Sequence, residues 1–402
     1  MSAVKKLAIA VVGGGTAGAA AAIFLARAGH RVSLFERVAE PGAVGAGILL
    51  QPTGMDVLRS LGLLEQTLEH GARIEALFGT NPRGRSVLDV RYRDWNAQAF
   101  GLGLHRGALF SILWNALASA GVERRSGVSV GRLTQTPQSV SLHCADAELG
   151  PFDCVVLADG TRSDLRGGLA LAPNVVPYPW GALWAMVPDA GLYPGQLRQW
   201  FRGAEQMLGL MPTGHAYGTA ASTLLSLFWS VPVDAVPDLR GEGLDAWKRE
   251  VLRLAPIESV LEHITDASQL SLATYADVQM RAWHDRRVVC IGDCAHATSP
   301  QLGQGANLAL MDARELARSL ADFAEVPTAL AQYSKRRRAH LNYYQRSSRW
   351  LTPFFQSHSR LASGLRDALL GPLCRAPYLR TQMARTLSGT KTGFVWGRLD
   401  TN

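Results

Sequence analysis

Residues 7–36 read LAIAVVGGGTAGAAAAIFLARAGHRVSLFE, and this stretch decides the fold. The apolar run over 7–12 predicts a strand that is covered on both faces. Three glycines interrupt the run, and an alanine-rich helix is predicted over 19–28, with Gly29 as its C-terminal cap. A second strand is predicted over 31–35. A strand, a glycine turn, a helix and a strand in this order indicate a Rossmann-like α/β fold.

The glycine turn also has the spacing G-x-G-x-x-G, with Gly13, Gly15 and Gly18 at its fixed positions. Gly13 permits the tight turn, Gly15 lets the backbone approach a pyrophosphate, and Gly18 lets the helix lie close to the sheet. Glu36 follows the second strand, where an acid receives ribose hydroxyls. A turn that only packs a helix on a sheet would leave Glu36 unexplained. The predicted dinucleotide contacts are Gly13, Gly15, Thr16, Ala17, Gly18, Glu36 and Arg37.

Length and composition are those of an ordinary globular protein with room for two domains. The chain has 402 residues, of which 47% are hydrophobic and 18% charged. No apolar run is long enough for an integral membrane span. The five cysteines have no metal-ligand spacing, so no metal is expected, and they fit a reducing, cytoplasmic location.

The net charge of +8 is concentrated at the C-terminal end of the chain. Residues 314–402 hold 15 Lys/Arg and 5 Asp/Glu, so the rest of the chain is close to neutral. A nucleic-acid partner is not expected from this excess. A solvated helix face, or attraction of an anionic cofactor, explains it better.

The chain divides into three predicted parts. The nucleotide-binding domain is discontinuous and comprises residues 1–72, 97–168 and 282–345. Residues 73–96 and 169–281 form a mostly antiparallel sheet domain, with strands at 180–187, 197–202, 206–211 and 223–231. Strand-like runs at 128–130 and 139–144 predict a hairpin. Helices are expected over 53–61, 107–119, 307–323 and 327–346, and residues 346–402 form a C-terminal helical segment.

Two further motifs follow the glycine turn in the chain. The first is D-G-x-x-S-x-x-R, from Asp159 to Arg166. The second runs from Gly292-Asp293-Cys294-Ala295-His296 through Pro300 and Gly303-Gln304-Gly305-Ala306-Asn307 to Asp312. Together the three motifs resemble those of single-component FAD-dependent aromatic hydroxylases, the group that includes para-hydroxybenzoate hydroxylase and salicylate hydroxylase. The resemblance covers roughly residues 7–345.

This resemblance implies the following cofactor contacts. Gly47, in the glycine-rich loop 42–47, and Arg106 would lie near the flavin and its phosphates. Asp159 and Gly160 would serve FAD and nicotinamide binding, although Asp159 could instead cap a turn. Gly292 and Asp293 would meet the ribityl chain. The helix start with Gly303, Gln304, Gly305, Ala306 and Asn307 would point N–H groups at the flavin pyrimidine. His296 is expected to be structural.

The chemistry implied by the resemblance is hydroxylation of a small aromatic or other electron-rich substrate. NADH or NADPH would reduce FAD, and O2 would add to it as a C4a-hydroperoxide. Pro300 would lie at the flavin edge. Loop 42–47 would let the flavin move, so that substrate gates its reduction. The alternatives are an epoxidase, dehydrogenase or reductase of the same fold, or a FAD-binding protein without turnover.

The substrate pocket is expected between the flavin and the inserted sheet. Candidate lining residues are Trp184, Trp200, Met207, Leu210, Met211, Phe228 and Trp229. His215 and Tyr217 are candidate catalytic proton acceptors, unless they lie on an exposed turn.

Apolar residues of the C-terminal segment, among them Trp350, Phe354, Phe355, Leu361, Leu365 and Leu369, predict a helix face. This face is expected to cover the core. A homodimer contact or a membrane surface remains an alternative.

Overall fold

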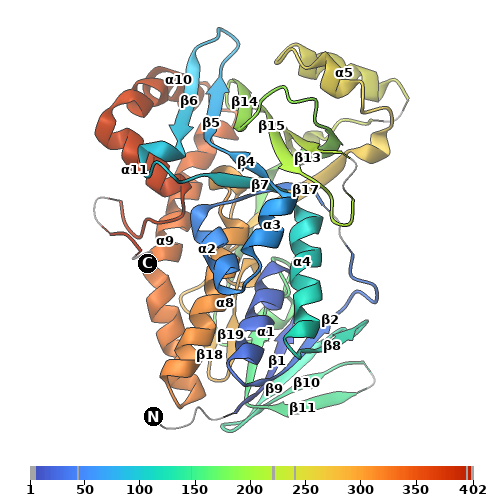
Figure 1. Ribbon diagram of the computed structural model, residues 1–402, viewed down its shortest axis with the longest axis vertical. Helices are drawn as coiled ribbons and strands as arrows, with labels where there is room; N and C mark the ends of the chain where they lie inside the picture. The colour runs from blue at the N-terminus through green and yellow to red at the C-terminus, as the bar shows by residue number, and fades with distance from the viewer. Residues whose placement is uncertain are drawn as a thin grey trace.

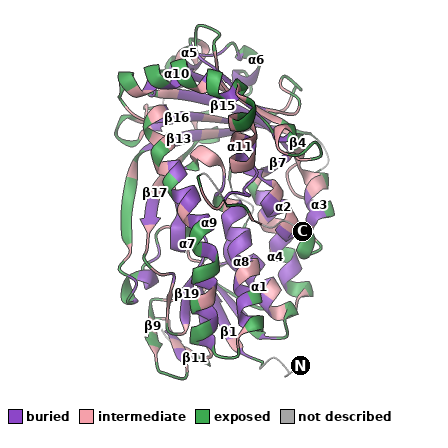
Figure 2. Cartoon of the chain, turned by 90° about the vertical axis from the view of Figure 1, so that its left-hand side faces the viewer, coloured by how far each residue is buried: buried purple, intermediate pink, exposed green. Residues whose placement is uncertain are grey.

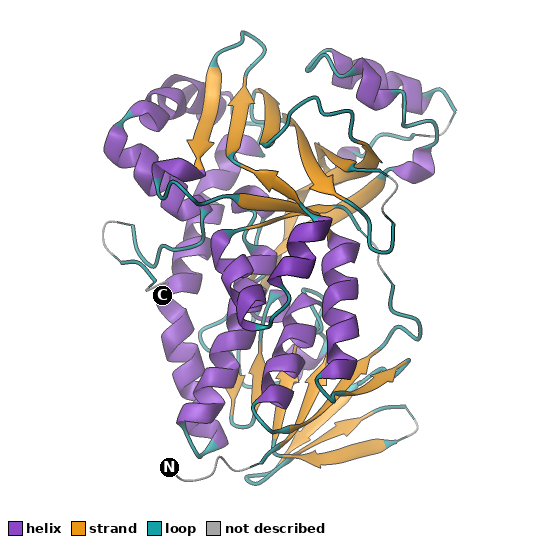
Figure 3. Cartoon of the chain, viewed as in Figure 1, coloured by secondary structure: helices purple, strands orange, loops and turns teal. Residues whose placement is uncertain are grey.

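The computed structural model describes residues 6–42, 45–145, 147–219, 222–239, 241–394 and 397–399. Strands gather at the two ends of an elongated molecule, and most of the long helices lie between them or along one side (Figures 1 and 3). Among the described residues, no helix is long and apolar enough to cross a membrane.

The lower sheet carries the glycine motif. Its strand order is β18-β19-β12-β1-β2-β8, with β1 (Ala8–Val12), β2 (Arg31–Glu36), β8 (Glu123–Ser126), β12 (Cys154–Leu157), β18 (His284–Asp285) and β19 (Val288–Cys290). All neighbours are parallel except β18 and β19. Val12 pairs with Leu157, and Leu157 with Cys290. Three neighbouring strands therefore end at the same edge.

Helices cover this sheet and fill the middle of the molecule. They are α1 (Thr16–Arg27), α2 (Pro52–Ser60), α3 (Leu64–His70), α4 (Arg106–Ser119), α7 (Asp293–His296), α8 (Gly305–Asp322) and α9 (Val326–Phe355). Helix α1 is buried almost all round, and its small side chains Ala17, Ala19, Ala20, Ala21 and Ala22 let it pack closely against α4 and α8.

The upper sheet has seven strands in the order β17-β13-β16-β15-β14-β5-β6. They are β5 (Ala76–Thr80), β6 (Ser86–Arg91), β13 (Asn174–Pro188), β14 (Gln196–Arg202), β15 (Gln206–Gly214), β16 (Leu224–Pro232) and β17 (Ser271–Gln279). Only β5 and β14 pair in parallel. α5 (Gly243–Leu252) and α6 (Glu258–Leu261) cover one face. The α/β fold class predicted from the sequence, with an inserted antiparallel sheet, is confirmed.

Two small sheets and five short helices complete the fold. One sheet, β3 (Gly47–Leu50), β7 (Gly101–His105) and β4 (Ala72–Ile74), lies between the two large ones; the other comprises β9 (Arg132–Gln135), β10 (Val140–His143) and β11 (Glu148–Phe152). The 3-10 helices are η1 (Tyr92–Asp94), η2 (Leu165–Gly168), η3 (Val233–Ala235), η4 (Ala267–Gln269) and η5 (Pro300–Leu302).

The hairpin predicted from residues 128–130 is wrong in its first strand. Gly127 has φ +75°, which ends β8, and residues 128–130 are irregular. The hairpin partner of β10 is β9, because Thr136 Oγ1 accepts from the backbone N–H groups of Gln138 and Ser139 and closes the turn. Turn chemistry, not apolar alternation, sets this register.

The C-terminal helices are α9, α10 (Arg360–Arg375) and α11 (Pro377–Leu387). Helix α9 runs through residue 346, where the sequence predicted a boundary. The expectation that apolar residues here cover the core holds for Phe355, which is buried, and for the half-buried Phe354. It is wrong for Trp350, Leu361, Leu365 and Leu369, which are exposed.

Candidate functional site

The three sequence motifs meet where β1, β12 and β19 end. A Cβ on Gly13 would collide with Ala158, the residue before Asp159, and a Cβ on Gly292 would collide with Ala17. Arg166 closes the third side, because its guanidinium donates to the carbonyl oxygens of Cys294 (2.6 Å) and Thr161 (3.0 Å). Glycine contacts and one buried arginine thus bring the motifs to one edge of the sheet.

Glu36 stabilises the glycine turn itself. Its Oε2 accepts a hydrogen bond from the Gly14 N–H (2.8 Å) and its Oε1 accepts from the Val38 N–H (2.9 Å). The Trp114 ring of α4 lies against Gly14. Thr16 is half-buried, and Arg37 is exposed beyond the strand. The acid predicted to face a ribose therefore lies beside the glycine turn, with an indole that the sequence analysis missed.

Gly15 and Gly160, two of the predicted cofactor contacts, face open space. A Cβ on Gly15 or on Gly160 would meet no described atom within 4 Å, whereas one on Gly18 would collide with the Gly13 carbonyl. Asp159 lies next to Gly160, and its buried Oδ1 has no hydrogen-bond partner among the described residues. Burial raises the pKa of Asp159, against the lowering effects of Ser163 and Cys294. The space bordered by Gly15, Gly160 and Asp159 is called the cradle below. Its unpaired buried acceptor is consistent with a bound polar group.

Asp293 lies close to the start of α8. It is exposed at the first position of α7, and its Oδ1 is 3.9 Å from the point where Gly305 would carry a Cβ. Gly303 has φ +59°, a left-handed conformation that turns the chain into the start of α8. The N-terminal N–H groups of α8 and the Asp293 carboxylate thus lie on the same side.

The side chains of Gln304 and Asn307 are used inside the protein. Gln304 Nε2 donates to the Leu387 carbonyl (2.7 Å), which joins α8 to α11. Asn307 Oδ1 accepts from the Gln51 N–H (2.8 Å), and its Nδ2 donates to the Leu49 carbonyl (3.2 Å). At these two positions, the backbone is what remains for a ligand.

Gln51 is a polar residue of this region that sequence analysis missed. Its side chain is buried, and Tyr92 Oη donates to its Oε1 (2.6 Å), which fixes the orientation of the amide. Its Nε2 is buried without a partner among the described residues and lies 3.9 Å from the Cβ position of Gly303. An unpaired donor at the start of α8 adds to the positive end of the helix dipole.

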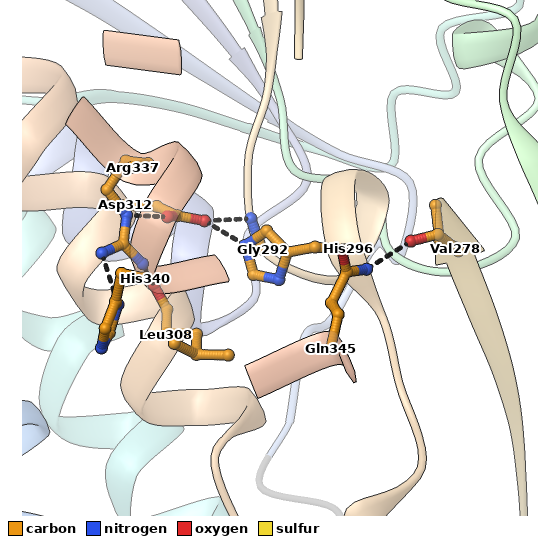
Figure 4. A network of polar contacts seen from close by, with 8 residues as sticks. All are labelled: Val278, Gly292, His296, Leu308, Asp312, Arg337, His340 and Gln345. Carbon is orange, nitrogen blue, oxygen red and sulfur yellow. Dashed lines mark hydrogen bonds and ion pairs between the residues drawn. The ribbon is translucent and has the colours of Figure 1, made fainter. Parts of the chain in front are cut away.

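A buried polar network supports the Gly292–His296 turn from behind (Figure 4). Asp312 Oδ2 accepts from the Gly292 N–H (2.9 Å) and lies 2.5 Å from His296 Nε2, while Arg337 Nε donates to its Oδ1 (2.7 Å). Burial by itself raises the pKa of Asp312, but His296 and Arg337 outweigh it and hold that pKa below its usual range. The structural role expected for His296 agrees with this network.

His340 completes the network as a neutral ring. Its Nδ1 must accept, because the Arg337 guanidinium at 2.8 Å can only donate, and its Nε2–H donates to the Gly389 carbonyl (2.7 Å). Burial and the Arg337 charge lower the pKa of His340 to about 3. A proton on Nδ1 would place two donors face to face.

Arg106 and Gly47 lie at the junction of the two large sheets. Arg106 is exposed at the start of α4, and its side chain lies against Gly45. Gly47 donates its N–H to Ser226 Oγ of β16 (3.2 Å). Ala43 and Val44 of the predicted mobile loop are outside the described residues, so that loop is only partly placed.

The upper sheet separates the predicted pocket residues onto opposite faces, because side chains alternate along a strand. Trp200, Leu210 and Trp229 lie on the face that α5 and α6 cover, called the back face below. Their assignment to the pocket is therefore wrong. Met207 and Met211 belong to clusters on the opposite face, called the front face below, where Phe228 packs between them. The centre of the Trp184 ring lies 5.0 Å from that of Phe228. Alternation alone could not say which face was covered.

This front face is linked to the loop that carries Pro300. Gln301 Nε2 donates to Gln356 Oε1 (2.7 Å), and Gln356 Nε2 donates to Ser230 Oγ (2.9 Å), two residues beyond Phe228. Tyr275 of β17 is also on the front face, since Trp184 Nε1 donates to its Oη (3.2 Å). Burial raises the pKa of Tyr275. Pro300 itself is exposed at the start of η5.

His215 and Tyr217 lie on the flank of the helical layer. Tyr217 Oη accepts from Asn115 Nδ2 (2.9 Å), and its ring stacks on that of His70. The His215 N–H donates to the His70 carbonyl (2.8 Å). Asn115 is nine residues along α4 from Arg106, or about 13 Å at the helical rise. The structure thus groups this pair with α3 and α4.

Two cavities border other parts of the described structure. One, of about 230 Å³, is lined by Pro52 and Thr53 at the start of α2, by Trp95 and Phe100, and by Thr390. The other, of about 320 Å³, lies between the Arg202–Gln206 turn and the start of α10. Both are outside the edge where the three motifs meet.

Residues 6–347 match the family described as FAD binding domain. The chain belongs to this family of flavoprotein monooxygenases. Its cradle fits FAD, since Gly15 and Gly160 leave open space, Glu36 lies at the glycine turn, and Asp159 and Gln51 offer unpaired polar atoms.

Its relatives include named monooxygenases. The flavoprotein is 32% identical to 3-amino-4-hydroxybenzoate 2-monooxygenase of Streptomyces cremeus, over 78% of each chain. It is 29% identical to aurachin C monooxygenase/isomerase of Stigmatella aurantiaca, over 90% of this chain and 94% of the relative. The structure of 2-methyl-3-hydroxypyridine-5-carboxylic acid oxygenase, in a tetrameric form, covers 95% of this chain and 96% of its own with TM-score 0.78 and 22% identity, which shows the shared fold.

Proposed function

We propose that the flavoprotein hydroxylates a small aromatic or other electron-rich apolar substrate, using NADH or NADPH and O2. The observation that carries this proposal is the meeting of the three motifs around an open cradle, with the Pro300 loop tied by Gln356 to the aromatic front face of the upper sheet. The name of 3-amino-4-hydroxybenzoate 2-monooxygenase, which describes oxygenation of a substituted benzoate, supports it.

The ADP half of FAD is proposed to lie along the glycine turn. Gly15 and the first N–H groups of α1 would bind the pyrophosphate, beside Thr16 and Ala17. Glu36 would accept ribose hydroxyls, and Trp114 would border the adenosine. Arg106 and Arg37 are exposed cations and would neutralise phosphate charge.

The flavin half is proposed to lie between Asp293 and the start of α8. Asp293 would accept from the ribityl hydroxyls, with Asp159 and Gly160 beside it. The N–H groups from Gly303 to Asn307 and the Gln51 amide would face the pyrimidine ring, where negative charge accumulates on reduction. When bound, FAD supplies the redox chemistry, taking a hydride from the nicotinamide and activating O2.

The protein groups left for the substrate are those of the front face. Trp184 and Phe228 present ring faces, and Pro300 would position the substrate against the flavin edge. Tyr275 is an ionisable group on this face, and its hydroxyl, held by Trp184, could exchange a proton with a substrate hydroxyl. His215 and Tyr217 remain the earlier candidates, but their contacts with α3 and α4 favour Tyr275.

A substrate panel tests the proposal when NAD(P)H consumption, peroxide release and oxygenated product are followed together. A true substrate is expected to speed anaerobic flavin reduction by at least about tenfold, equivalent to about 1.4 kcal/mol. Equal reduction rates with and without it would contradict gating by substrate. A yellow protein that does not speed NAD(P)H oxidation with any aromatic compound tested would contradict hydroxylation and favour a non-catalytic FAD-binding protein.

The role of Tyr275 has a matched control in Tyr193, which packs on Trp200 at the back of the same sheet. Tyr275→Phe is expected to lower product formed per NAD(P)H by at least about tenfold, and Tyr193→Phe to leave it within about twofold.

A cytoplasmic location and a homodimer also stay predictions. Cell fractionation would check the location, and ultracentrifugation would check the oligomeric state.

A further inference from the structure

The outer face of α10 is apolar along almost its whole length. Leu361, Leu365, Leu369 and Leu373 recur every four residues and are 75%, 44%, 54% and 42% exposed. Gly364, Ala368 and Pro372 are the exposed residues between them. Every exposed position between the terminal residues Arg360 and Arg375 is therefore apolar, which reverses the usual orientation of a surface helix.

The inner face of the same helix fixes this orientation. Arg366 is buried, donates to the Phe354 carbonyl (2.9 Å) and lies over the Phe201 ring at 5.0 Å. Gly371 lies against the Ser86 backbone of β6, where a Cβ would collide. Because the arginine and the glycine hold the helix on the sheet, the leucines face solvent. Much of α10 has the colour of exposed residues in Figure 2.

Positive charge borders this leucine face. Arg360 and Arg375 are exposed at its two ends. Asn81 Nδ2 donates to Asp367 Oδ2 of α10 (3.0 Å), which brings the turn with the exposed Arg83 and Arg85 beside the helix. Asp367 is the one acid of α10, and it is engaged by Arg366 as well. Residues 346–402 hold nine Lys/Arg and two Asp/Glu.

We propose that α10 docks flat on the surface of an anionic lipid bilayer. The four leucines would enter the acyl boundary, and Arg83, Arg85, Arg360 and Arg375 would reach the headgroup phosphates. A second copy fits less well, since pairing two such faces would bring two basic borders together in either orientation. The proposal is independent of the reaction and requires no membrane-spanning helix.

Vesicle sedimentation of the FAD-loaded full chain tests the proposal. The protein is expected to bind vesicles of equal phosphatidylcholine and phosphatidylglycerol, and less in high salt. Leu365→Glu/Leu369→Glu should weaken binding by at least about tenfold. Leu192→Glu/Val233→Glu, which changes two exposed apolar residues elsewhere, is the matched control and should bind as the unmodified protein does. Retained flavin in both variants shows that they are folded.

A second variant isolates the charge. Arg83→Gln/Arg85→Gln is expected to weaken binding to anionic vesicles by about fivefold for each arginine. Equal binding to pure phosphatidylcholine would overturn the anionic surface as the target.

Two other results would overturn docking altogether. One is no vesicle binding, or binding unaffected by Leu365→Glu/Leu369→Glu. The other is an ultracentrifugation mass that falls from dimer to monomer in that variant, which would assign the face to a second copy.

Discussion

Asp159 and Asp312 are two largely buried carboxylates near the same Gly292–His296 turn, and their surroundings are opposite. Asp312 has a partner for each oxygen, in Gly292, His296 and Arg337. Asp159 has a buried oxygen without a partner among the described residues. The pKa of Asp312 is lowered by its partners, and that of Asp159 is raised by burial.

The difference separates a structural site from a ligand site. A buried charge with all its partners present stabilises the fold, whereas one with a missing partner costs stability unless a ligand supplies it. Asp312 therefore holds the turn in place, and Asp159 faces the cradle where we propose that the cofactor binds. Four substitutions break or sharpen this contrast.

The largest effect is expected for Asp312→Ala. It leaves Arg337 buried without its carboxylate, so the free energy of unfolding in urea should fall by about 3–5 kcal/mol. Asp322→Ala, on the same helix, removes an exposed pair with Arg336 and should cost less than about 1 kcal/mol. If Asp312→Ala does not fold, Asp312→Asn replaces it. A loss no larger than that of Asp322→Ala would contradict the structural role.

Asp293→Ala tests the exposed carboxylate of the cradle. It should leave stability unchanged but weaken FAD binding by about 1.5–3 kcal/mol, the range for a hydrogen bond to a charged group. Flavin fluorescence titration measures this loss, which is roughly tenfold or more. Released flavin should chromatograph as FAD. A fully loaded variant with unchanged affinity would remove Asp293 from the site.

His340→Gln should weaken the fall of the free energy of unfolding with decreasing pH. The unfolded chain takes up a proton near pKa 6.5, but native His340, with a pKa of about 3, does not. Stability is therefore lost as the pH falls, by about 2 kcal/mol from His340 between about pH 7 and about pH 5. Urea unfolding at both pH values should show this loss reduced in His340→Gln. The exposed His358→Gln is the control and should keep the slope.

The smallest effect is a gain for Asp159→Asn in flavin-free protein. Because its folded pKa is raised, the ionised carboxylate costs stability as pH rises above the unfolded value near 4. Removing the charge should add about 0.5–1 kcal/mol to the free energy of unfolding at neutral pH and nothing to it at about pH 3. A loss at neutral pH would mean that Asp159 has a protein partner after all.

Much of the nucleotide edge was predictable because it depends on local geometry. Gly13 and Gly18 are required wherever a strand, a turn and a helix approach closely, so their spacing predicts that approach without any distant contact. The order of the three motifs then indicated the fold, since parallel strands end at one edge. The turn at Thr136 could also have been predicted from the sequence. The apolar alternation at residues 128–130 instead led to the wrong first strand of the hairpin.

The sequence by itself determined the fold class, the glycine turn and the family. The tertiary structure decided which face of the upper sheet is free, where Tyr217 lies, that Gln51 keeps an unpaired amide, and that the leucines of α10 point outward. The physical reason is that a periodic pattern defines two faces but not what covers them. Coverage depends on residues far apart in sequence, as when buried Arg366 and Gly371 hold α10 with its apolar side to solvent.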